Sequence, residues 1–131
     1  MGDWWNQYMP IPFAEKGRSK EGSDCWGLPY IIYPEQLGII LPDYLDCYEN
    51  TNDREGLAVL IAQERESRWK ETDTPEPFNL IFLRMRGLPM HVGLVTKPGH
   101  FIHCAKGIGT SHERFDNMRW KDKVLGFSRY E

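Results

Sequence analysis

The chain has 131 residues, a length typical of one domain, and we expect a single unit over residues 1–131. Hydrophobic residues make up 40% of the chain and aromatic residues 13%, which is enough for a packed core and excludes intrinsic disorder. A formal net charge of −3 offers no strong attraction to nucleic acid, so we expect no such partner. The best apolar stretch, residues 31–41, is interrupted by Pro34 and Glu35, and we expect no membrane partner either.

Residues 1–22 are rich in aromatic residues, glycine and proline, and the polar, turn-like run GRSKEGSD covers residues 17–24. This composition predicts an irregular N-terminal arm that wraps over the surface. The start MGDWWNQYMPIP has neither the basic residues nor the apolar stretch of a signal peptide, so we expect none. The three cysteines, Cys25, Cys47 and Cys104, cannot all pair and lack CxxC spacing, so at least one should be a free thiol.

Two helices are predicted in the first half of the chain. Ser23 or Asp24 can cap a helix that begins at Cys25 and runs toward Gly38. A second helix should follow a cap at Asn52 or Asp53, with the charged segment QERESRWKE as a mostly solvated later half.

The second half predicts antiparallel strands, because short runs of branched and aromatic residues alternate there with turn signals. The expected turns are GLP near Gly87, KPG near Lys97 and KGIG near Lys106. Helices followed by strands are typical of an α+β fold. The strands are expected at NLIFLRM (79–85), HVGLVT (91–96), HFIHCA (100–105), TSHERF (110–115) and VLGFSRY (124–130).

Cys25 and two histidines form the candidate chemical site. A cysteine at a helix start meets exposed amides and the positive end of the helix dipole, so its pKa should lie below the ordinary value of about 8.5. His91 and His103 lie on strands joined by the KPG turn, which places them diagonally across a hairpin. One imidazole can then orient the other, as in nucleophilic catalysis by a thiol.

Three motifs in this order resemble those of the NlpC-type cell-wall cysteine peptidases, a papain-like family. GSDCWGL is similar to the nucleophile motif, HVGLV to the histidine strand and FIHCA to the strand with the third polar residue. The resemblance extends from about Pro12 to the C-terminus and is closest to the branch found in tail proteins of bacteriophages and phage-like particles. It implies that the helix with the nucleophile packs on an antiparallel sheet of five or so strands.

The resemblance also implies an activity: a cysteine endopeptidase that hydrolyses amide bonds in peptidoglycan stem peptides. Cys25 attacks the carbonyl, His91 takes up and returns the proton, and His103 orients His91, with no metal or other cofactor. In the tail-protein branch, the enzyme is made in the host cytoplasm and carried on a phage or phage-like tail. Tail-tip or hub proteins are then its expected partners, and cell-wall penetration its expected role.

Three further positions are implied as substrate-binding residues: Phe13, Asp24 and Trp26. Phe13 stands where many members have a tyrosine whose hydroxyl lines the oxyanion site, and phenylalanine has no hydroxyl. Trp26 replaces the serine that, with the preceding aspartate, binds the free amine of the substrate in recycling enzymes. An aromatic residue at 26 more simply anchors the helix to the sheet.

Other interpretations remain open. A structural tail-tip or tail-assembly subunit with weak or no activity is the main alternative, because of Phe13 and Trp26. The same three residues could also serve an acyltransferase or an amidase with another substrate. A zinc site of Cys25, His91, His103 and Cys104 is disfavoured, because residues 103 and 104 point to opposite faces of one strand.

Overall fold

The computed structural model describes residues 3–50, 53–85 and 88–131. The two halves of the chain form the expected α+β fold, with helices preceding most of a six-stranded antiparallel sheet whose order is β3-β8-β4-β5-β6-β7. The elements are η1 Trp4–Tyr8, β1 Arg18–Ser19, β2 Gly22–Ser23, α1 Gly27–Leu37, α2 Arg54–Arg68, β3 Trp69–Thr72, β4 Leu80–Met85, β5 Leu88–Lys97, β6 His100–Ala105, β7 Gly109–Arg114 and β8 Val124–Tyr130.

The N-terminal arm is more ordered than an irregular surface segment. It contains the 3-10 helix η1 and a short β1–β2 hairpin, and Trp5, Tyr8 and Ile11 are buried in the main core. The expectation of a surface wrap is wrong here because these large apolar side chains gain more by burial than by exposure.

Helix α1 begins at Gly27, two residues later than expected, and Cys25 lies in the preceding turn. Trp26 is the N-cap residue, and the side chain of Asp24 supports this start from the preceding turn, because its Oδ1 accepts a hydrogen bond of 2.9 Å from the backbone N–H of Gly27. The helix ends at Gly38, whose φ of 71° suits a residue without a Cβ, and its N–H donates to the carbonyl of Pro34.

Helix α2 is capped by Asp53, whose side chain accepts a hydrogen bond from the N–H of Gly56, whereas Asn52 lies outside the described residues. The segment QERESRWKE is mostly solvated, as expected, but it differs from the expectation in two respects. Glu64 is buried, and it accepts hydrogen bonds from the side chains of Tyr44 and Trp69. The chain also leaves the helix at Trp69 and forms β3, which pairs with β8.

The five expected strands are present as β4 to β8, and the turn after Lys97 is a two-residue turn of Pro98 and Gly99. Gly99 has φ of 77°, a conformation that glycine adopts without strain. The expected turn at Gly87 lies outside the described residues.

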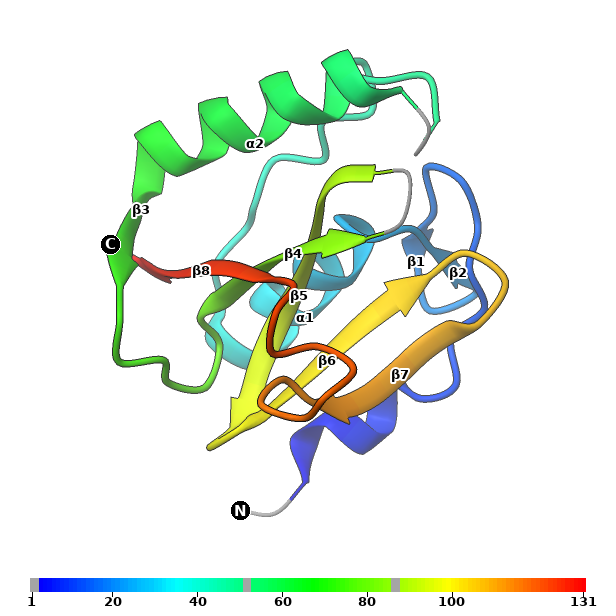
Figure 1. Cartoon of the computed structure of the whole chain (residues 1–131). Coiled ribbons are helices and arrows are strands. Elements are labelled where there is room, and N and C mark those ends of the chain that lie inside the picture. Colours follow the sequence, from blue (N-terminus) through cyan, green and yellow to red (C-terminus); the bar gives the residue numbers. More distant parts are fainter. Residues whose placement is uncertain (1–2, 51–52, 86–87) are drawn as a thin grey trace.

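Two clusters of buried side chains cover the two faces of the sheet. The larger one joins side chains of both helices to the sheet, and the smaller one joins the sheet to the loop that follows β7. Figure 1 shows the helices and this loop around the sheet. The buried members of the smaller cluster are Ile81, Leu83, Val95, Phe101 and Trp120. Among the described residues, no helix combines the length and apolarity that a bilayer crossing requires.

Candidate active site

His91 on β5 and His103 on β6 are in contact. The Nε2 atom of His91 and the Nδ1 atom of His103 are 2.8 Å apart and share a hydrogen bond. Pairs such as Leu94 with Ile102 set the register of the two strands, so the histidines sit diagonally on one face, as the sequence predicted. Only 2% of His91 and 1% of His103 is exposed.

Gly93 makes room for this pair. A Cβ added at this position would lie 2.8 Å from the carbonyl oxygen of Ile102 and 3.1 Å from the Cβ of His103. A side chain at residue 93 would therefore push β5 and β6 apart next to the imidazoles. This glycine is needed for close approach, not for a turn.

Glu113 on β7 extends the line of hydrogen bonds and was not a candidate in the sequence. Its Oε2 lies 2.7 Å from Nε2 of His103. The signal was available, because β6 and β7 form a hairpin in which Ser111 faces His103, so residue 113 is diagonal to that histidine. The hydrogen bond from His103 is the largest cause that lowers the pKa of Glu113 to about 2.

Burial makes His91 a neutral imidazole at physiological pH. Its pKa is lowered to about 3, first by desolvation and then by the nearby His103, while the charge of Glu113 acts in the opposite direction. A neutral imidazole can accept a proton from a thiol, which is what a general base must do.

Cys25 lies in the turn before α1, beside the strand β5 that carries His91. The backbone N–H groups of Val92 and Trp26 lie close enough to its sulfur to lower the pKa of the thiol, and Val92 directly follows His91. The thiol therefore lies beside the strand segment that holds the first imidazole. The structure thus joins His91 to His103 and places the Cys25 thiol beside Val92, whereas the action of Cys25 on His91 stays a prediction.

The expectation that Cys25 ionises easily is wrong for this structure. The residue is 6% exposed, and desolvation, followed by the negative charge of Asp24, raises the pKa of its thiol to about 12. These effects exceed the contribution of the two backbone N–H groups. The raised pKa of Cys25 and the lowered pKa of His91 accordingly leave both side chains neutral near pH 7.

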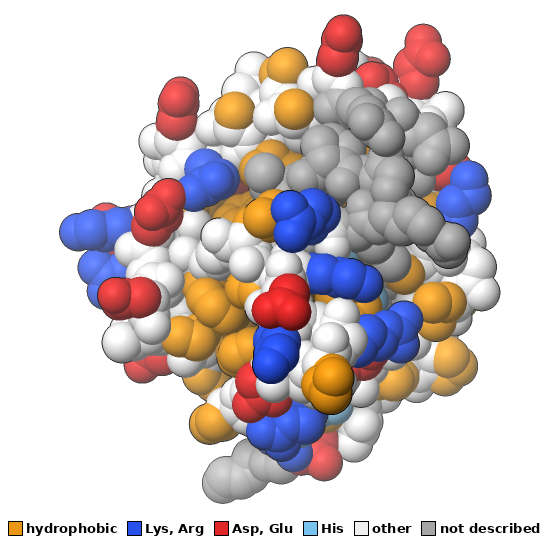
Figure 2. Space-filling view, in the orientation of Figure 1, with side chains coloured by type: hydrophobic (Ala, Val, Ile, Leu, Met, Phe, Trp, Pro, Cys, Tyr) orange, Lys and Arg blue, Asp and Glu red, His pale blue; other side chains and the backbone are white. Residues whose placement is uncertain are grey.

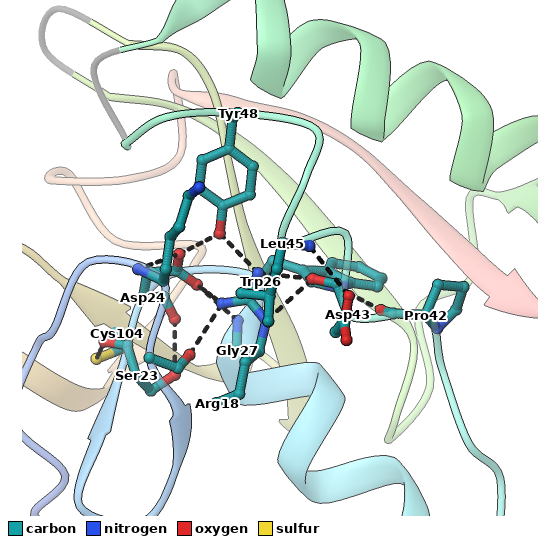
Figure 3. Close-up of polar contacts among 12 residues, drawn as sticks. Arg18, Ser23, Asp24, Trp26, Gly27, Pro42, Asp43, Leu45, Tyr48 and Cys104 are labelled. Atoms are coloured by element: carbon teal, nitrogen blue, oxygen red, sulfur yellow. Dashed lines mark hydrogen bonds and ion pairs between the residues drawn. The ribbon is translucent and has the colours of Figure 1, made fainter.

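Asp24 is completely buried and its carboxylate is fully occupied within the chain (Figure 3). It forms an ion pair of 2.8 Å with Arg18 and accepts hydrogen bonds from the backbone N–H groups of Lys16 and Gly27 and from the hydroxyl of Tyr48. In this structure the Asp24 carboxylate therefore serves the scaffold, and a contact with a substrate amine stays a prediction.

Trp26 is also part of the scaffold. Its ring is buried, and its indole N–H donates a hydrogen bond of 2.8 Å to the carbonyl of Pro42 (Figure 3). It contacts Tyr44 edge-on, so it anchors the start of α1 to the loop after that helix, and a contact with substrate stays a prediction. Phe13 is half-buried and its backbone bridges Ser23, two residues before Cys25, so a contact with substrate stays a prediction.

The two other cysteines lie away from this line, and all three are free thiols. Cys104 points to the face opposite His103, where its thiol donates to the carbonyl of Ser23 at 3.1 Å. Within the part of the chain that the structure describes, no group of three histidine, cysteine or carboxylate side chains is arranged to hold a metal ion. The alternative zinc site is thus not formed there.

The line of imidazoles is shielded from solvent. On the face shown in Figure 2, Lys and Arg side chains gather in front of the strands that carry the histidines, and only small areas of histidine surface are visible. A buried thiol, a hydrogen-bonded histidine pair and a helix packed on an antiparallel sheet together define the papain-like class of cysteine hydrolases.

Comparisons with known proteins identify the family. The family model described as NlpC/P60 matches residues 11–129. The chain belongs to the NlpC/P60 family, whose members are cysteine peptidoglycan hydrolases. A search of curated proteins found no match.

Solved structures share the fold at low sequence identity. The NlpC/p60 domain of the peptidoglycan hydrolase SagA has a TM-score of 0.61 at 18% identity, covering 94% of this chain and 89% of that one. A Bacillus cereus NlpC/P60 family protein has a TM-score of 0.67 at 21% identity, covering 98% of this chain and 39% of that one. A lipoprotein-like NLP/P60 family protein from Staphylococcus aureus has a TM-score of 0.58 at 23% identity, covering 92% and 36%. The chain thus corresponds to well under half of the two longer proteins.

Proposed function

We propose that this protein is a cysteine endopeptidase that hydrolyses amide bonds in peptidoglycan stem peptides. The observation that carries the proposal is the hydrogen bond between His91 and His103. The Cys25 sulfur lies beside Val92, the residue that directly follows His91. Membership in the NlpC/P60 family supports the choice of substrate.

In the proposed reaction, the Cys25 sulfur attacks the carbonyl carbon of the scissile amide while its proton passes to His91. The protonated imidazole then gives this proton to the leaving amine, and a thioester remains on Cys25. Water hydrolyses the thioester with His91 as base, which restores the thiol. His103 keeps His91 in the orientation that both steps need, and the backbone N–H of Cys25 stabilises the oxyanion.

We further propose that the protein works as a component of a phage or phage-like tail tip that aids cell-wall penetration. The support is the likeness of DCWGL and of the C-terminal segment from Glu113 to Tyr130 to the tail-protein branch. Tail-tip or hub proteins would be its partners. Mass spectrometry of purified particles tests this setting, because the protein should be found in particles and not only in the lysate; its absence from intact particles would contradict the location.

A structural tail subunit without activity is the second candidate. The burial of Cys25 and the raised pKa of its thiol favour it, since both oppose formation of the nucleophilic thiolate. This candidate shares the fold and the location but needs no substrate.

One experiment separates the two functions. Peptidoglycan sacculi are incubated with the wild type, with Cys25→Ala and with Cys47→Ala, a matched control that removes a partly exposed thiol, and released peptides are measured by mass spectrometry. We expect release by the wild type and the control, and none by Cys25→Ala. Equal release by Cys25→Ala would contradict the proposal, and no release by the folded wild type would favour the structural role.

A further inference from the structure

A fourth side chain completes the line from the thiol. We propose that Glu113 is a positioning residue that fixes where the protons sit on His103 and His91, so that Nδ1 of His91 stays free to take the proton of Cys25. This inference rests on the proposed function, in which His91 is the base.

The carboxylate of Glu113 limits where the proton of His103 can lie. An ionised carboxylate only accepts hydrogen bonds, and the low pKa of Glu113 keeps it ionised. Nε2 of His103, 2.7 Å from Oε2 of Glu113, must therefore carry the proton. In neutral His103, Nδ1 is then the lone-pair nitrogen.

The proton position on His103 in turn limits where the proton of His91 can lie. When His103 is neutral, its Nδ1 can only accept, so Nε2 of His91, 2.8 Å away, is then the donor. A neutral imidazole has one ring proton, so Nδ1 of His91 is unprotonated. One carboxylate thus determines the tautomer of an imidazole two hydrogen bonds away.

Glu113 is itself held firmly. Its Oε1 accepts a hydrogen bond of 2.8 Å from the indole N–H of Trp120 and pairs with Arg119 at 3.3 Å, and its Oε2 also accepts from the hydroxyl of Ser111. The Trp120 ring packs edge-on against His103 with ring centres 5.3 Å apart. The carboxylate therefore cannot turn away from the imidazole without breaking several contacts.

The charge of Glu113 also favours the intermediate state of the reaction. When His91 takes the thiol proton, it becomes a buried cation, and the negative charge at the end of the line raises its pKa. Loss of this charge should slow the chemical step more than it weakens substrate binding.

A buried glutamate elsewhere in the chain provides a matched control. Glu64 accepts a hydrogen bond from the indole N–H of Trp69, as Glu113 does from Trp120, but its partners include no histidine among the described contacts. Glu64→Gln therefore removes a carboxylate of similar setting without touching the line of imidazoles.

The first test uses no substrate. Side-chain ¹⁵N chemical shifts of the histidines at pH 7 should show the Nε2–H tautomer for both His91 and His103 in the wild type and in Glu64→Gln. In Glu113→Gln, whose amide can donate as well as accept, a second tautomer of His91 should appear. An Nδ1–H tautomer of His91 in the wild type would overturn the inference, whether or not the protein hydrolyses peptidoglycan.

The second test uses stem-peptide release. We expect Glu113→Gln to lower kcat by about 10- to 100-fold, as loss of groups that orient a reacting residue does, with KM changed less than about twofold. Glu113→Asp, which keeps the charge, should recover part of kcat, whereas Glu64→Gln should leave it within about twofold. Unchanged kcat in folded Glu113→Gln would overturn the inference, while inactivity of the wild type would count against the proposed function alone.

Discussion

Asp24, which is buried, and Glu113, which is partly buried, are two carboxylates in hydrogen-bond networks, and they serve different ends. Asp24 pairs with Arg18, a guanidinium that stays protonated, and its remaining hydrogen bonds come from backbone N–H groups and a tyrosine hydroxyl. Glu113 pairs with His103, an imidazole that can exchange its proton and that contacts His91. The first network can only hold the chain in place, whereas the second can direct a proton.

The roles of these two carboxylates are the opposite of what their distances from Cys25 in the sequence suggest. Asp24 directly precedes Cys25, the proposed nucleophile, yet its bonds stabilise the turn and the hairpin around it. Glu113 lies 88 positions after Cys25, and the pairing of β6 with β7 brings it to His103. Neighbours of a nucleophile therefore need not act on the substrate, and the partner of a carboxylate decides its role.

The largest expected effect is on catalysis and falls on the histidine line. His91→Ala should reduce kcat/KM for stem-peptide release by about 10³-fold or more, because the thiol loses its base. His100→Ala, a control on β6 whose imidazole bonds to the backbone of Pro98, should stay within about twofold. Comparable activity of His91→Ala and the control would contradict the claim that the network of Glu113, His103 and His91 serves catalysis.

The next effect is on stability and falls on the Asp24 network. Arg18→Met leaves a buried carboxylate without its cation, which should lower the free energy of unfolding by about 3–5 kcal/mol in urea titrations. Arg129→Met removes an exposed pair with Glu131 and should cost less than about 1 kcal/mol. Similar losses in both variants would show that the Asp24 network does not hold the fold.

A smaller effect concerns acid sensitivity. The folded pKa of His91, about 3, lies below its ordinary 6.5, so between these values the unfolded chain binds a proton that the folded chain does not. Stability should therefore fall as pH drops through this window, by about 2 kcal/mol between pH 7.5 and 5 for this group. The His91→Gln variant should lose that part of the slope in urea unfolding at each pH, and an unchanged slope would contradict the buried neutral state of His91. Glu113 adds its own loss only below its ordinary pKa of 4.5.

The strands and the histidine pair could be predicted because local patterns determine them. Alternation and turn residues located β4 to β8, and the Pro98–Gly99 turn alone made His91 and His103 diagonal neighbours. The strand β3 could not be found in this way, because WKET continues a charged helical pattern and becomes a strand only through pairing with β8.

The parts of the site that depend on burial were not predictable. The helix dipole favours a thiolate at Cys25, but the desolvation that opposes it arises from packing between distant segments. The occupation of Asp24 depends likewise on Arg18 and on Tyr48, which folding brings from both sides. The same diagonal pairing, extended from β6 to β7, would also have predicted Glu113 as a neighbour of His103.

The central claim is that Cys25 is the nucleophile and that His91 activates it. A stem-peptide analogue with a chloromethyl ketone in place of the scissile amide alkylates a thiol bound next to the reacting carbonyl, and peptide mapping by mass spectrometry locates the adduct. The account predicts an adduct on Cys25, none on Cys47 or Cys104, and a strongly slowed reaction in His91→Ala. An adduct on Cys47 or Cys104 instead, or labelling of Cys25 at equal rates in the wild type and His91→Ala, would contradict it.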